Sequence, residues 1–401
     1  MRWLCTFALV TLAALLAPAC FDPHFNRPAC GPGGECPGGT RCIASICETD
    51  MDAGGSDAGM AGDGAGGASP DSTTGEQDAA PVLCFGSFVR ICLSALPTTP
   101  VTLSDVDLDI DTGTSPLCDS RTTDYCVVAG TSFSIAAGRI LHGHGSLPLI
   151  LVSTTTAAFQ LTGDINVSSS HDGIAGTGAA PGSICLAAAS PPTPATINSG
   201  GFGGSLGGKG GNGEQTDGVA GIAGAAATSF PAALRGGCPG GAGGAGGAGG
   251  SGGGAVAIIA ASVQVDGKIN ASGAGGHAGG IVKSGGGGGG SGGMIVLDAP
   301  AITGSGSLFA NGGGGGGGGA LGIAGDEGGE STAATTAAAG AKNAGKDGGS
   351  GGDGSATTRP IGGPGVNSQN NGGGGAGGGG AGFIRARGAT SLTISPPSIS
   401  Q

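Results

Sequence analysis

Short stretches in which apolar and polar residues alternate recur throughout residues 83–401. Period-two alternation is typical of β-strands that bury one face. Two of the stretches repeat one another, because an offset of 39 residues carries Val263 to Ile302 (302 − 263 = 39) and Ile269 to Leu308 (308 − 269 = 39). The pattern therefore predicts an all-β region built from a repeated unit of short strands.

Further copies of this unit extend the repeat along the chain. An earlier copy lies at 159–167, and a truncated last copy covers 383–395. A short β unit cannot bury its apolar face alone, whereas copies stacked in parallel share one continuous core. The sequence thus predicts a parallel β-helix or a similar β-solenoid over 83–401, with long glycine-rich loops that leave it chiefly at 174–254 and 312–382.

The glycine-rich segments hold much of the chain's 97 glycines. Glycine is costly to order, so disorder is one interpretation. The sequence "GGAGGAGGAGGS" at 240–251 has a period of three, which suits extended left-handed polyglycine or polyproline-type helices packed side by side. The composition of 200–382 resembles that of PE-PGRS-type glycine-rich bacterial surface proteins, although the PE domain is missing. That resemblance implies an exposed surface role and no reaction.

Residues 1–19 have the features of a secretory signal peptide. Arg2 precedes an apolar run at 3–16, which is too short to span a bilayer, and small residues precede Cys20. The ending "ALLAPAC" resembles a bacterial lipobox, whose cysteine becomes lipidated, although Ala17 stands where leucine is usual. We therefore expect an exported chain anchored through Cys20 in the outer membrane or at the cell surface, with free secretion as the alternative.

Two small regions follow the predicted signal peptide. Residues 20–47 contain four closely spaced cysteines besides Cys20 and are too short to fold around an apolar core, so disulfides are expected to hold them together. This module is similar to the small Cys-rich modules of some bacterial surface lipoproteins. A zinc site is the alternative, but no Cys-x2-Cys pair is present. Residues 48–82 lack Lys and Arg and are predicted to be an acidic, disordered linker.

Cysteine number supports an oxidising compartment. Of the 12 cysteines, Cys5 leaves with the signal peptide and Cys20 carries the lipid, which leaves ten (12 − 2 = 10), an even number. Cys185 and Cys238 would pin the longest glycine-rich segment to the strands. The disulfide candidates form three local groups: Cys30, Cys36, Cys42 and Cys47; Cys84, Cys92, Cys118 and Cys126; and Cys185 with Cys238.

Residues 101–113 contain the most suggestive polar pattern, in which four aspartates alternate with the apolar residues Val106, Leu108 and Ile110. Four carboxylates could bind Ca²⁺, which prefers oxygen ligands. The other interpretation is a solvated face that keeps an edge strand from pairing with other chains. The four candidates are Asp105, Asp107, Asp109 and Asp111.

Two further motifs lie close to this stretch. The sequence "IDTGTS" at 110–115 resembles the active-site loop of aspartic proteases, but that chemistry needs two such aspartates and no second Asp-Thr-Gly occurs. It therefore predicts a turn at Gly113. His142 and His144 would project from one side of an extended segment, yet no third ligand is near in sequence, so solvated imidazoles are expected.

Charge and element order restrict the function classes. The net charge is −12, with 15 basic and 27 acidic residues, so nucleic acid is not an expected partner. Strand and helix patterns do not alternate as they do in cofactor-binding α/β enzymes, and no cofactor is expected. These features favour a non-enzymatic surface lipoprotein with a structural or adhesive role, a lipid-anchored membrane attachment and a protein or polysaccharide partner. The alternatives are a polysaccharide-acting β-helix enzyme and a calcium-dependent adhesin.

Overall fold

The computed structural model divides the chain into two compact units, residues 1–77 and 78–401. Of the first unit it describes an antiparallel hairpin, β1 (Thr40–Ile43) and β2 (Ile46–Thr49), in which Cys42 lies opposite Cys47. The described residues of the chain are 40–43, 46–49 and 83–396, with gaps at 120–122, 180–184, 186–189, 343–346, 358, 367, 370 and 390.

Several predicted features lie outside the described residues. These are the signal peptide at 1–19, the lipidation site Cys20, the cysteines Cys30 and Cys36, and the linker from residue 50 to residue 82. Their assignments remain predictions. Among the described residues, no helix has the length and apolar character needed to cross a membrane.

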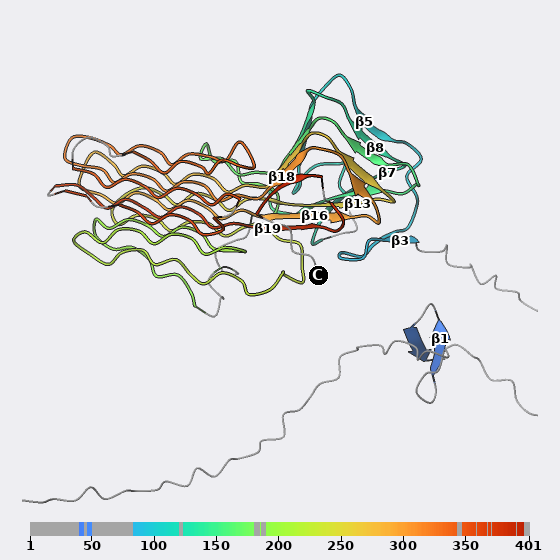
Figure 1. Ribbon diagram of the computed structural model, residues 1–401, viewed down its shortest axis with the longest axis horizontal. Coiled ribbons are helices and arrows are strands. Elements are labelled where there is room, and N and C mark those ends of the chain that lie inside the picture. Colours follow the sequence, from blue (N-terminus) through green and yellow to red (C-terminus); the bar gives the residue numbers. More distant parts are fainter. Residues whose placement is uncertain are drawn as a thin grey trace, which may run out of the picture. The chain divides into compact units, whose positions relative to one another are not determined.

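The described residues of the second unit form three parallel sheets, and the chain contributes a strand to each of them in turn (Figure 1). Sheet 1 comprises β7 (Cys126–Gly130), β10 (Leu149–Ser153), β13 (Ala255–Ile259), β16 (Met294–Asp298) and β19 (Phe383–Ala386). Sheet 2 comprises β5 (Val101–Leu103), β8 (Phe133–Ile135), β11 (Phe159–Leu161), β14 (Val263–Val265) and β17 (Ile302–Thr303). Sheet 3 comprises β6 (Leu108–Asp111), β9 (Ile140–His144), β12 (Asp164–Asn166), β15 (Lys268–Asn270), β18 (Ser307–Phe309) and β20 (Thr393–Ser395). β3 (Leu83–Phe85) and β4 (Ile91–Leu93) form an antiparallel pair.

The sequence repeat corresponds to the pairing of strands in these sheets, because residues 39 positions apart lie opposite one another. Val263 in β14 lies opposite Ile302 in β17, and Ile269 in β15 lies opposite Leu308 in β18. The truncated last copy also pairs in parallel, since Ile394 in β20 lies opposite Leu308. The predicted offset of 39 residues is therefore confirmed, because residues that occupy equivalent places in the core carry equivalent side chains.

The sheets differ in burial, and the difference follows from what covers them. Every residue of β10 and β13 is buried, whereas β8, β11 and β14 bury alternate residues. Sheet 1 has apolar clusters on both faces: one formed with sheets 2 and 3, and one that includes Leu206, Leu234 and the β3–β4 hairpin. A strand covered on both faces needs an unbroken apolar sequence, which explains the run "LILV" at 149–152.

The predicted parallel β-helix, or β-solenoid, is wrong. In the part of the chain that the structure describes, the strands form separate flat sheets and no closed β-helix. After β12, β15 and β18 the chain leaves sheet 3 and runs through a glycine-rich segment before it returns to sheet 1. Because the chain does not turn directly from sheet 3 into sheet 1 at these places, it does not wind a closed coil.

The segments predicted to be long loops form an ordered assembly of their own, which we call the glycine array. It consists of the described residues of 190–254, 271–293 and 310–382, which run side by side away from the sheets (Figure 1). Residues 285–290 show how it is built. Their N–H groups donate to segments 241–244, 274–277 and 374–377, and their carbonyls accept from 201–204, 247–250 and 313–316. Each central segment is thus surrounded by six hydrogen-bonded neighbours.

This packing explains why the segments are glycine. At Gly288 a Cβ would lie 1.7 Å from the carbonyl oxygen of Phe202, at Gly289 it would lie 2.2 Å from that of Gly313, and at Gly290 it would lie 2.0 Å from that of Ser251. Gly285 approaches the same neighbour as Gly288. The contacted neighbour therefore repeats every third residue, as in a polyglycine helix with three residues per turn. The period of three at 240–251 reflects this packing.

Asp298 at the end of β16 attaches the β3–β4 hairpin to sheet 1. Its Oδ2 accepts hydrogen bonds from the backbone N–H groups of Ser87 and Phe88, and its Oδ1 accepts one from the Ser87 hydroxyl. Burial raises the pKa of Asp298, but the hydrogen bonds from Phe88 and Ser87 and the charge of Arg385 outweigh that effect, so the pKa lies below its ordinary value.

We expect Asp298→Asn to cost about 2 kcal/mol of unfolding free energy at pH 7, because the hydrogen bonds to a charged acceptor are lost. A lowered pKa in the folded state stabilises the fold above the unfolded pKa of about 4, and this contribution disappears as the pH falls through the folded value. Urea titrations at several pH values should therefore show that the difference in unfolding free energy between the two proteins shrinks as the pH falls below about 4. A constant difference down to pH 2 would contradict this role of the carboxylate.

Candidate functional site

The four aspartates predicted as weak calcium candidates do not converge on one point. Asp105 accepts a hydrogen bond from the Ser104 hydroxyl, and Asp107 lies 3.5 Å from Arg139 and accepts a hydrogen bond from the N–H of Ile140. Asp109 lies 3.3 Å from His144. Among the residues that the structure describes, no group of three or more His, Cys, Asp and Glu could hold a metal ion.

Two of these aspartates, Asp109 and Asp111, lie on an edge strand. β6 is the terminal strand of sheet 3, and Asp109 is exposed on it. The strand begins at Leu108, so Val106, expected on the apolar face, is instead 71% exposed in the preceding turn. The acidic side chains place charge along a strand edge that would otherwise be free to pair with another chain, as the second interpretation has it.

Asp111 and the two histidines lie at the same edge. Asp111 accepts hydrogen bonds from the N–H of Gly113 and the hydroxyl of Thr114, which lower its pKa, and the chain turns there. This agrees with the predicted turn in "IDTGTS". His142 and His144 lie on the same face of β9, opposite Asp109 and Asp111 in the register.

Three disulfides connect residues of the second unit. Cys84 pairs with Cys92 and Cys118 pairs with Cys126, each across a separation of eight residues. Cys185 pairs with Cys238, as the hypothesis for the longest glycine-rich segment has it. That bridge spans 53 residues and connects Cys238, in the glycine array, to a residue that precedes the array.

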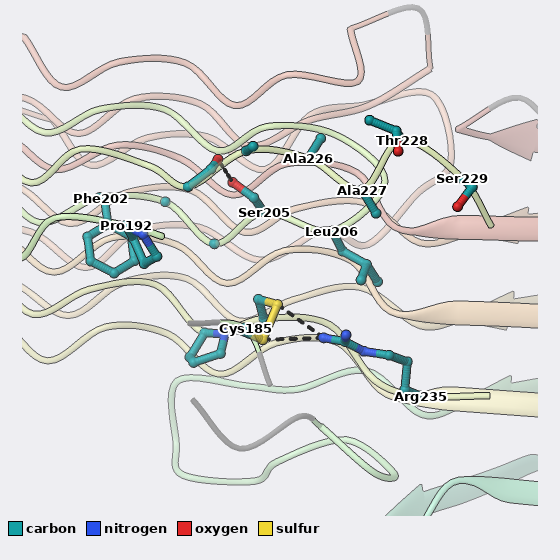
Figure 2. Close-up of a pocket in the computed structure, with 16 residues that line it drawn as sticks. Cys185, Pro192, Phe202, Ser205, Leu206, Ala226, Ala227, Thr228, Ser229 and Arg235 are labelled. Carbon is teal, nitrogen blue, oxygen red and sulfur yellow. Dashed lines mark hydrogen bonds between the residues drawn. A yellow bond between two sulfur atoms is a disulfide. The ribbon is translucent and has the colours of Figure 1, made fainter. Parts of the chain in front are cut away.

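A cavity of about 410 Å³ lies beside the Cys185–Cys238 disulfide (Figure 2). Arg235 extends toward the two sulfur atoms, and its Nη2 lies 3.3 Å from each Sγ. Burial lowers the pKa of Arg235. Apolar side chains line much of the remaining wall, namely those of Pro192, Phe202 and Leu206.

The sequence analysis identified neither this cavity nor two histidine–glutamate pairs that the structure brings together. His171 Nδ1 lies 2.9 Å from Glu330 Oε1, His277 Nδ1 lies 3.3 Å from Glu327 Oε2, and the two imidazole rings are 6.4 Å apart. Each histidine is paired with its own glutamate. No local spacing could have indicated these pairs, because their partners lie 159 and 50 residues away in the chain.

The hairpin ends of the glycine array carry exposed apolar side chains. Hydrogen bonds and an ion pair connect these ends: Gly322 N donates to Ile281 O at 2.8 Å, and Lys283 Nζ lies 2.8 Å from Asp217, which also accepts from Asn198 Nδ2. We call the surface formed by these hairpin ends the turn surface. Its apolar members are Ile197 (57% exposed), Val219 (49%), Ile281 (66%), Val282 (54%), Leu321 (78%) and Ile323 (49%).

Comparison with known proteins identifies no relative. No protein-family model, no curated protein and no solved structure matches the chain. Functional arguments for this protein therefore rest on its own residues.

Proposed function

We propose that this protein is an exported, non-enzymatic surface protein with a structural or adhesive role, held at the cell surface through Cys20. The glycine array serves as a stiff support, and the turn surface at its hairpin ends makes the contacts. The compositional resemblance of 200–382 to glycine-rich bacterial surface proteins is consistent with this role.

The exposure of the turn surface is the observation that carries the proposal. The interior of the array leaves little room for side chains, as the contacts of Gly285 and Gly288 show. Side chains able to recognise a partner must therefore lie at the hairpin ends or on the outer faces. Large apolar side chains that remain exposed together on a soluble surface commonly mark an interaction site.

The test is retention of intact cells that produce the protein on polystyrene and on glass. Replacing Ile281, Val282, Leu321 and Ile323 together by serine should reduce retention on polystyrene at least about tenfold, because each side chain contributes apolar area to the contact. Protease added to intact cells should have the same effect if the protein is exposed outside. Retention on glass should change little.

A matched fourfold variant controls for loss of exposed apolar area in general. Leu96, Val106, Leu117 and Ile174 are also exposed and lie outside the turn surface, with exposures from 46% to 71%. Their replacement by serine should leave retention unchanged, and both variants should keep the melting temperature of the parent because the side chains are exposed. Equal losses in the two variants would reject the turn surface as the adhesive element.

A further inference from the structure

We propose that the cavity beside the Cys185–Cys238 disulfide binds a small organic anion, whose carboxylate pairs with Arg235 and whose apolar body packs on Phe202, Leu206 and Pro192. The site is separate from the turn surface, so this inference does not depend on the proposed adhesive role.

Arg235 is a half-buried cation without a carboxylate partner among the described residues. The two acidic residues nearest to it in sequence are engaged elsewhere: Glu214 accepts hydrogen bonds from the N–H groups of Ser368 and Gly375, and Asp217 pairs with Lys283. The chain has 27 acidic and only 15 basic residues. An unpaired, partly buried cation in such an acidic protein is costly unless an anion joins it.

The protein contacts of Arg235 leave much of its hydrogen-bonding capacity unused. Nη2 faces the sulfur atoms of Cys185 and Cys238, which are weak acceptors, and Nε lies 3.4 Å from the carbonyl oxygen of Gly236. A guanidinium carries five N–H donors in a planar fork that matches a carboxylate. The disulfide therefore fixes the direction of the side chain, and donors remain available toward the cavity that Arg235 lines.

The rest of the cavity wall indicates what else the ligand must carry. Phe202, Leu206, Pro192 and the methyl group of Ala226 provide apolar surface. The hydroxyl of Ser205 is already occupied, because it donates to Gly224 O and accepts from Gly210 N. A volume of about 410 Å³ lies within the range of small-molecule sites. A carboxylate on a compact apolar body fits this distribution, and benzoate is a simple probe of that class.

Isothermal titration of the full-length protein with benzoate, benzyl alcohol and benzylamine tests the proposal. We expect benzoate to bind and the uncharged and cationic analogues to bind at least about tenfold more weakly, because they cannot pair with the guanidinium. Arg235→Gln should weaken benzoate binding at least about tenfold. Arg387→Gln removes an exposed arginine that does not line the cavity and should leave binding unchanged.

A second variant keeps the test decisive if Arg235→Gln does not fold. Ala226→Phe keeps Arg235 and the disulfide but fills the apolar side of the cavity, so it should also weaken benzoate binding at least about tenfold. Benzyl alcohol binding as tightly as benzoate would overturn the assignment of an anion site. So would benzoate binding that Arg235→Gln and Ala226→Phe leave unchanged, and so would the absence of benzoate binding to the parent protein at millimolar concentration.

Discussion

Replacement of Gly288 by alanine should destabilise the protein by about 3 kcal/mol or more, because it places a methyl group where no space exists. The added Cβ would lie 1.7 Å from the carbonyl oxygen of Phe202 and 2.4 Å from its carbonyl carbon. Both are backbone atoms, so no side-chain rotation can relieve the contact. The neighbouring segments would have to separate and lose hydrogen bonds, including the one from Gly288 N to Gly241 O.

Gly280 offers a matched control at the end of the same hairpin. A Cβ there would meet only the Ser284 hydroxyl, at 3.9 Å, and the backbone is not in the left-handed region. Gly280→Ala should therefore be neutral, or stabilising by up to about 1 kcal/mol through the unfolded state. Urea denaturation of the two variants decides the matter. If Gly288→Ala were as stable as Gly280→Ala, the close packing of the array would be disproved.

The register of the strands could be predicted from the sequence because buried side chains specify it. Val263 and Ile302 occupy equivalent core positions, and the sequence repeats accordingly. The start of β6 was harder to predict. The alternation that includes Val106 continues across a turn, so pattern alone could not show that this side chain leaves the core.

The glycine array could not be predicted in the same way. Its hydrogen bonds join segments far apart in the chain, such as Gly201 with Gly286 and Gly286 with Gly374. A glycine carries no side chain that could reveal which neighbour it faces or at what register. The period of three at 240–251 indicates the local conformation, but it contains no information about the six neighbours of a central segment.

The candidate sites show the same division. The alternation at 101–113 placed Asp109 and Asp111 on a strand, and that strand lies at the edge of sheet 3. The sequence did not indicate a role for Arg235, since a single arginine three residues before Cys238 belongs to no motif. Its significance comes from the Cys185–Cys238 bridge, which joins residues 53 positions apart and brings a cation, a disulfide and a cavity together.

Phe159→Ala should produce the other large loss of stability, about 3–5 kcal/mol, by opening a cavity in the core between the sheets. Phe159 in β11 is fully buried and stacks on Phe133 in β8, with ring centroids 5.0 Å apart. Its neighbour Gln160 is not part of the core, so Gln160→Ala should change the unfolding free energy by less than about 0.5 kcal/mol. Equal effects of these two substitutions would contradict the assignment of the core.

The unfolding curves of Phe159→Ala and Gly288→Ala also report how the two parts of the second unit depend on each other. Segments of the array continue directly into sheet 1, since 284–293 lead into β16 and 372–382 lead into β19. A loss of packing in either part should therefore also lower the stability of the other. We expect a single transition in urea, monitored by circular dichroism, that moves to lower concentration in both variants. Two separate transitions, each shifted by only one substitution, would show that the array and the sheets unfold independently.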